Sequence, residues 1–124
     1  MSDSTETLAQ LRKAVQHFVD ERDWSQFHTP KNLAMSLAIE AAELMEHFQW
    51  LDVPQSVDRG RDPAHREQIA DELADVACYL FSLTNALELD LSDAVRNKLV
   101  KNATKYPVEL SRGRSDRPTR PEEA

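Results

Sequence analysis

Two pairs of carboxylates in this sequence have a spacing that could bind a metal ion. Glu40 and Glu43 form the first pair, and Glu72 and Asp75 form the second. Residues three apart on a helix are neighbours on one face, so two such helices side by side would gather four carboxylates. Hard divalent cations such as Mg²⁺ prefer oxygen ligands, with Mn²⁺ as the alternative, and either would neutralise this charge. The spacing therefore indicates a divalent metal site, with a solvated acidic helix face as the other interpretation.

The segments that carry these pairs also carry apolar residues at helical spacing. The acids border those apolar stripes, which are formed by Leu33, Leu37, Leu44 and Leu51 in the first segment and Ile69, Val76 and Leu83 in the second. Ionised carboxylates near a core are unfavourable unless something positive neutralises them, which favours the metal site over the solvated face. A di-iron bundle would need Glu-x-x-His motifs, and the sequence has none.

Composition indicates one all-α domain. The chain has 124 residues, only two glycines and few strand-like alternations. A net charge of −7 argues against a nucleic-acid partner. No apolar run approaches the length of a membrane span and no signal peptide opens the sequence, so we expect a cytoplasmic protein without a membrane partner. The single cysteine, Cys78, lies in an apolar helical stretch and is interpreted as a core residue.

Capping signals and apolar periodicity predict four helices. The expected ranges are residues 4–21, 30–51, 63–87 and 93–106, with a long loop at 52–61. Asp3 and Glu6 resemble a capping box before the first helix, and Thr29-Pro30 and Asp62-Pro63 are helix starts. We expect a four-helix bundle-like subunit whose broad apolar faces assemble into a homo-oligomer, either a dimer or a tetramer. Residues 108–124 have little apolar content and are expected to form a disordered tail.

Three further groups of side chains could contact a ligand. Trp24, Phe27 and His28 stand together in a short polar connection, where they either cover the core or form a stacking wall for a planar ligand. Lys31 lies in a helical first turn that favours an anion, or is simply solvated. A third group occupies neighbouring helix positions and either complements the helix dipole or faces phosphates, namely Lys98, Asn102 and Lys105.

Four stretches follow one another in the sequence, at residues 22–33 (RDWSQFHTPKNL), 40–50 (EAAELMEHFQW), 71–76 (DELADV) and 98–107 (KLVKNATKYP). In this order they resemble the MazG-like all-α nucleotide pyrophosphohydrolases, most closely their dCTP pyrophosphatase branch. The resemblance spans about residues 8–107 and places the domain at residues 1–107. One departure is Val15, which stands where the dCTP-preferring relatives carry a histidine. Cytosine, a modified cytosine and another pyrimidine all stay open as the base.

The resemblance implies hydrolysis of a nucleoside triphosphate to the monophosphate and pyrophosphate, with Mg²⁺ held by Glu40, Glu43, Glu72 and Asp75. It also implies that Trp24 and Trp50 lie where the base and sugar are held and that a second subunit completes the site. Our mechanistic hypothesis is that these two tryptophans sandwich the base. The other residues that it implies for the sugar and phosphates are Tyr79, Lys98, Asn102, Lys105 and Tyr106. A non-enzymatic metal-binding module and a pyrophosphohydrolase for a dUTP-like nucleotide are the alternatives.

Overall fold

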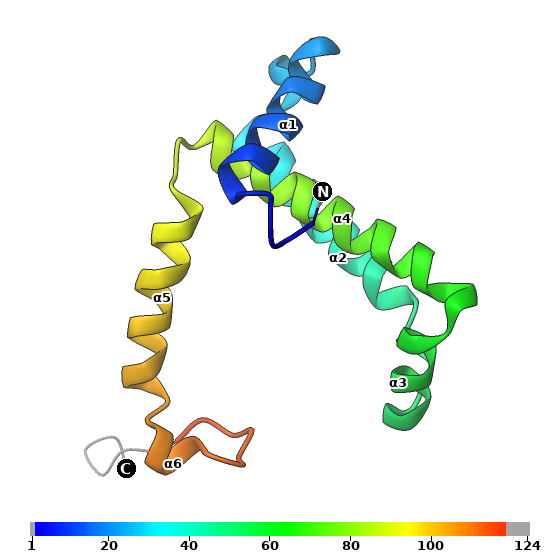
Figure 1. Cartoon of the computed structure of the whole chain (residues 1–124), viewed down its shortest axis with the longest axis vertical. Helices are drawn as coiled ribbons and strands as arrows, with labels where there is room; N and C mark the ends of the chain where they lie inside the picture. The colour runs from blue at the N-terminus through cyan, green and yellow to red at the C-terminus, as the bar shows by residue number, and fades with distance from the viewer. Residues whose placement is uncertain (1, 119–124) are drawn as a thin grey trace. The chain divides into compact units, whose positions relative to one another are not determined.

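Two long helices, α2 (Pro30–Glu46) and α4 (Pro63–Ala86), lie side by side and form the centre of the first part of the molecule (Figure 1). This computed structural model describes residues 2–118. Both helices begin as predicted. The Thr29 hydroxyl accepts from the Asn32 amide, the Asp62 carboxylate accepts from the Ala64 amide, and a proline follows each cap. A side-chain oxygen thus pairs with an amide that the helix leaves free, and proline needs no partner.

Helix α1 (Leu8–Glu21) packs against α4. Its N-terminal cap is Thr7, which forms a capping box with Gln10, so the predicted start at about residue 4 with an Asp3–Glu6 box is wrong. Arg12 and Asn85 tie the two helices together. The Arg12 Nε donates to the Asn85 side-chain oxygen at 3.1 Å, and the Asn85 amide donates to the Arg12 carbonyl at 3.1 Å.

The buried core of this region is small. Leu33 on α2 is 1% exposed, and Val19 on α1 and Ile69 on α4 are also buried. Many large apolar side chains stay exposed in the single subunit, among them Met35, Ile39 and Leu73. A short 3-10 helix, η1 (Ser25–Phe27), joins α1 to α2.

The segment predicted as a loop at residues 52–61 is helix α3 (Val53–Arg61), so that prediction is wrong. Asp52 and Gln55 form a capping box at its start, and α2 ends at Glu46 rather than Leu51 because residues 47–50 form a turn. The loop interpretation rested on Pro54 and Gly60. However, proline is favourable in a first helical turn, and the only cost of the glycine is a modest loss of helix propensity.

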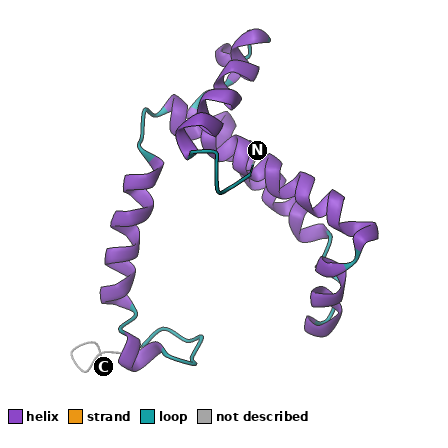
Figure 2. Cartoon of the chain, in the orientation of Figure 1, coloured by secondary structure: helices purple, strands orange, loops and turns teal. Residues whose placement is uncertain are grey.

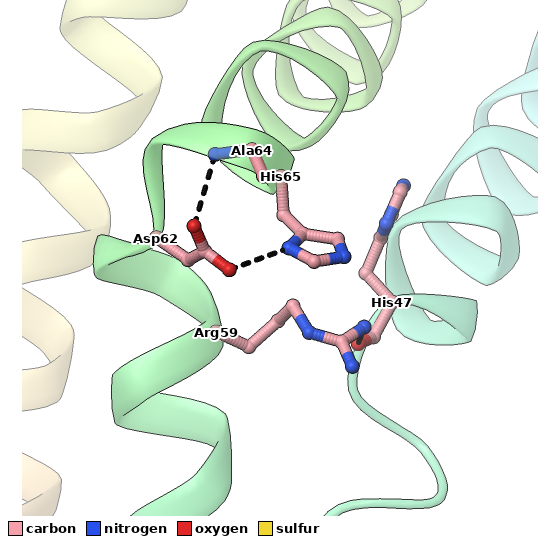
Figure 3. A network of polar contacts seen from close by, with 5 residues as sticks. All are labelled: His47, Arg59, Asp62, Ala64 and His65. Atoms are coloured by element: carbon pink, nitrogen blue, oxygen red, sulfur yellow. Dashed lines mark hydrogen bonds and ion pairs between the residues drawn. The ribbon is translucent and has the colours of Figure 1, made fainter.

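A polar network fixes the junction between α3 and α4 (Figure 3). One Asp62 oxygen accepts from the Ala64 amide at 3.0 Å, and the other lies 3.0 Å from the His65 Nδ1. From α3, Arg59 donates to the carbonyl of His47 at 3.4 Å. These contacts lower the pKa of Asp62, first through the Ala64 amide and then through His65.

The chain divides into two compact units, Met1–Leu89 and Asp90–Ala124, and each is described by itself. The second contains α5 (Leu91–Lys105) and α6 (Val108–Ser111). Asp90 caps α5 by accepting from the Asp93 amide. Helix α6 lies inside the segment expected to be a tail, residues 119–124 lie outside the described residues, and the domain boundary at 107 stays a prediction.

Residues 2–118 are helical with connecting turns and contain no β-strand, which confirms the all-α class (Figure 2). The bundle-like packing of four helices stays a prediction, because α5 belongs to the second unit. Within the same residues, none of the helices is both apolar enough and long enough to span a membrane.

Candidate metal centre

Three of the four predicted carboxylates come together between α2 and α4. Glu40 and Glu43 on α2 and Glu72 on α4 each offer an oxygen, and these three oxygens lie within 4.8 Å of one another. Asp75 is not in this close group and is exposed, although its charge raises the pKa of both Glu40 and Glu72. The two helices thus gather the acids as their spacing predicted, with Asp75 at the edge of the cluster.

The cluster is electrostatically unfavourable as it stands. Burial is the largest cause that raises the pKa of Glu40 to about 7, and the neighbouring Glu43 adds to it. Burial also raises the pKa of Glu72, again with the charge of Glu43 contributing. Desolvation and nearby like charge both disfavour the ionised form of a carboxyl group.

Two oxygens of the cluster also lack partners. The Oε2 atoms of Glu40 and Glu72 are buried, and neither has a hydrogen-bond partner among residues 2–118. Buried polar atoms are almost always paired, so an exception calls for an explanation. A divalent cation bound by carboxylate oxygens would satisfy both atoms and reverse the sign of the local charge. The residues present therefore fit a hard cation such as Mg²⁺.

The predicted aromatic residues lie at both ends of α2. Trp24 is 44% exposed and packs edge-on against Phe18 of α1, with 5.8 Å between ring centroids. The side-chain amide of Asn32 donates to the carbonyl of Phe27, which ties η1 to the first turn of α2. Trp50 follows the other end of α2 and is 86% exposed.

This placement bears on the predicted base sandwich. A helix of 17 residues is about 25 Å long, so α2 separates the two tryptophans by far more than a stacked base requires. One subunit therefore does not place Trp24 and Trp50 on the same base. A sandwich between them would need a tryptophan from each of two subunits.

The other predicted ligand residues stand as follows. Tyr79 lies on α4, half-buried, two helical turns after Glu72, and Lys31 is exposed in the first turn of α2. Within the second unit, Lys98 and Asn102 are on α5, and the Lys105 ammonium lies 5.3 Å from the centroid of the Tyr106 ring. The roles of these residues stay predictions.

Sequence reasoning missed a cavity of about 330 Å³ between α1, η1 and α4. His28, already a candidate, lines it together with Ser82. Ser82 gave no signal because it stands in an otherwise apolar stretch of α4, where a serine is ordinarily a helix residue of small volume. The cavity exists only through the packing of α1 on α4, which spacing within one helix does not reveal.

Comparisons with known proteins agree on one family. The model of the MazG-like family matches residues 35–117. The mouse protein named dCTP pyrophosphatase 1 is 41% identical over 107 residues, which are 86% of this chain and 63% of the mouse protein. Its human namesake is 39% identical over 109 residues, which are 88% of this chain and 64% of the human protein. This chain thus spans less than two thirds of the length of these curated relatives.

A solved structure supports the same relationship. The crystal structure of a pyrophosphatase from Archaeoglobus fulgidus superposes with a TM-score of 0.77 and is 35% identical in sequence. The match covers 86% of this chain and 98% of that one. The arrangement of helices described above is therefore shared with a protein of nearly the same extent.

Proposed function

Since this chain belongs to the MazG-like family, we propose that it is a Mg²⁺-dependent nucleotide pyrophosphohydrolase. Its substrate in this proposal is a deoxynucleoside triphosphate, dCTP or a modified dCTP, and its products are the monophosphate and pyrophosphate. The names of the relatives support the reaction class. The observation that carries the proposal is the convergence of Glu40, Glu43 and Glu72, with two buried carboxylate oxygens left unpaired.

The carboxylates have distinct parts in this proposal. Glu40 and Glu72, whose buried oxygens lack partners, would hold the cation together with Glu43 and Asp75. When bound, Mg²⁺ supplies Lewis-acid stabilisation of charge on the phosphate oxygens. Glu43 orients the attacking water and accepts its proton as general base. The water oxygen forms a new bond to phosphorus as the bond to the pyrophosphate leaving group breaks.

The proposal includes a homodimer or homotetramer. Met35, Ile39 and Leu73 are large apolar residues that the single subunit leaves exposed, and a subunit interface is the ordinary remedy. Light scattering after gel filtration tests this point, and a monomer at micromolar concentration would contradict it.

The activity test is a product analysis. Purified protein is incubated with Mg²⁺ and each common and 5-substituted deoxynucleoside triphosphate, and the products are separated by chromatography. We expect monophosphate and pyrophosphate, with no reaction in EDTA. Diphosphate and phosphate would mean that a different bond is cleaved. Absence of turnover by folded, Mg²⁺-bound protein would favour a non-enzymatic metal-binding module.

Variants test the site assignment. We expect Glu43→Gln and Asp75→Asn each to lower kcat by about 100-fold or more, because each removes a charged group from the reacting centre. Glu46→Gln is the matched control, since Glu46 is an exposed acid on the same helix outside the cluster. Wild-type turnover in Glu43→Gln or Asp75→Asn would show that these carboxylates are not the site.

A further inference from the structure

The cavity between α1, η1 and α4 has walls that are held in place by hydrogen bonds. Gln16 and Ser25 both line it and both donate to one oxygen of Asp20, at 2.8 and 3.1 Å. Asn85 also lines the cavity, and its side chain accepts a hydrogen bond from the Arg12 side chain and donates one to the Arg12 carbonyl. The cavity, of about 330 Å³, is within the size range of small-molecule sites, roughly 300–1,000 Å³. It is thus a braced cavity of a size suited to a small ligand.

Ser82 faces this cavity without a partner. The residue as a whole is 7% exposed, and its hydroxyl makes no hydrogen bond within residues 2–118. The hydroxyl oxygen is not among the enclosed atoms without a partner, so it is accessible from the cavity. Thr84, two residues further along α4 and equally buried, behaves differently, since its hydroxyl donates to the carbonyl of Phe81 at 2.9 Å. A buried serine ordinarily makes such a bond to its own helix. The free hydroxyl of Ser82 is therefore available to a molecule in the cavity.

His28 supplies a second free group. It is half-buried, lines the same cavity, and its imidazole has no hydrogen-bond partner in the part of the chain that the structure describes. A hydroxyl both donates and accepts, and a neutral imidazole does one at each ring nitrogen. Ser82 and His28 together can thus bind a ligand edge that carries both a donor and an acceptor.

The cavity lies on the α4 face that leads to the acidic cluster. Asp75, Tyr79, Ser82 and Ala86 follow one another at spacings of four, three and four residues, which places them on one side of the helix. Ser82 is seven residues from Asp75 at the edge of the cluster and ten from Glu72 within it, or about 10 and 15 Å along the helix axis. A nucleoside triphosphate with its phosphates at the cluster spans an offset of this order.

We infer that Ser82 is a specificity-determining residue, with the nucleobase of the substrate seated in this cavity and its polar edge bonded to the Ser82 hydroxyl and the His28 imidazole. The inference rests on the proposed function and deepens it. The cavity of about 330 Å³ is large enough for a pyrimidine ring. Discrimination between pyrimidines then depends on which donor and acceptor pattern the two side chains pair with.

Kinetics of Ser82→Ala test the inference. We expect the ratio of kcat/KM between the best pyrimidine nucleotide and the next pyrimidine to fall by about tenfold, as one hydrogen bond to the base is lost. Thr84→Val is the matched control, because it removes an equally buried hydroxyl whose bond is internal. An unchanged ratio in Ser82→Ala, or an equal change in Thr84→Val, would overturn the inference.

A binding measurement separates this inference from the proposed function. Calorimetry without metal gives the Kd of dCMP and dTMP for wild type, Ser82→Ala and Thr84→Val. We expect Ser82→Ala alone to weaken the preferred monophosphate by about tenfold. If Ser82→Ala hydrolyses the substrate with the wild-type monophosphate Kd and the wild-type kcat/KM ratio, the inference about Ser82 is wrong and the proposed function stands. If wild type does not hydrolyse any nucleotide but binds the monophosphate in a Ser82-dependent manner, the proposed function is wrong and the inference about Ser82 stands. If wild type binds neither monophosphate, the inference is overturned.

Discussion

Replacement of Glu40 by glutamine should make the metal-free protein more stable at alkaline pH. The pKa of Glu40 is raised from 4.5 to about 7, chiefly by burial. Between these two values the folded protein keeps a proton that the unfolded chain releases, so the free energy of unfolding falls as pH rises from about 4.5 to about 7. Glutamine has nearly the same shape as glutamate but does not ionise, so the free energy of unfolding of Glu40→Gln does not fall in this pH range through residue 40.

The size of the effect follows from the shift. A change from 4.5 to about 7 corresponds to about 3 kcal/mol above pH 7 when no solvent screening is allowed for. Glu40 is only half-buried, so screening reduces this value. We therefore expect Glu40→Gln to raise the free energy of unfolding by about 1 kcal/mol at pH 8, with a clearly smaller gain at pH 5.

Urea denaturation at pH 5 and pH 8, with EDTA present throughout, measures the difference in the free energy of unfolding between Glu40→Gln and wild type. Glu46→Gln is the control, because it removes an exposed carboxylate of the same helix outside the cluster. Addition of Mg²⁺ at pH 8 should then stabilise wild type, by about 2.7 kcal/mol at a hundredfold excess over Kd, and Glu40→Gln much less. A Glu40→Gln protein that is less stable than wild type at pH 8 in EDTA would refute the electrostatic account of the cluster.

Two further predictions concern the packing that positions the site. Leu33→Ala should lower the free energy of unfolding by about 3 kcal/mol, because it leaves a cavity at the most buried side chain between the helices, and urea denaturation measures it. Asn85→Ala should lower the free energy of unfolding by about 2 kcal/mol, because it breaks both hydrogen bonds to Arg12. Hydrogen exchange should show the loss of protection chiefly in α1. An equal loss of protection in α1 and α4 would contradict this prediction.

Helix positions were predictable where the signal is local. Thr29-Pro30 and Asp62-Pro63 each specify a cap and a first turn within four residues, and both starts are confirmed. The start of α1 was wrong because two capping boxes compete, one at Asp3 and the other at Thr7. The second prevails, since Leu8 directly after Thr7 begins the apolar stripe that packs on α4.

The site was predictable only in part, for a related reason. The spacing of Glu40 and Glu43 fixes their common face, and the pairing of α2 with α4 brings Glu72 to them. No spacing rule shows that Asp75 remains at the edge of the group. Ser82 was missed because its surroundings depend on contact between residues far apart in the chain, such as Arg12 and Asn85. Local patterns identify chemistry within a helix, and cavities between helices require the packed structure.

The acidic cluster is the place where the rules of stable folding are broken in this chain. Elsewhere in the first unit, caps, apolar stripes and hydrogen bonds all favour the same helices. At Glu40 and Glu72 the fold instead buries carboxylate oxygens without partners and beside like charge. Natural proteins depart from such consistency mainly at functional sites, where the loss is offset by a ligand. Ser82, on the same helix as Glu72, differs from these two residues, because its hydroxyl is not among the enclosed oxygens without a partner and is instead accessible at the cavity that Ser82 lines.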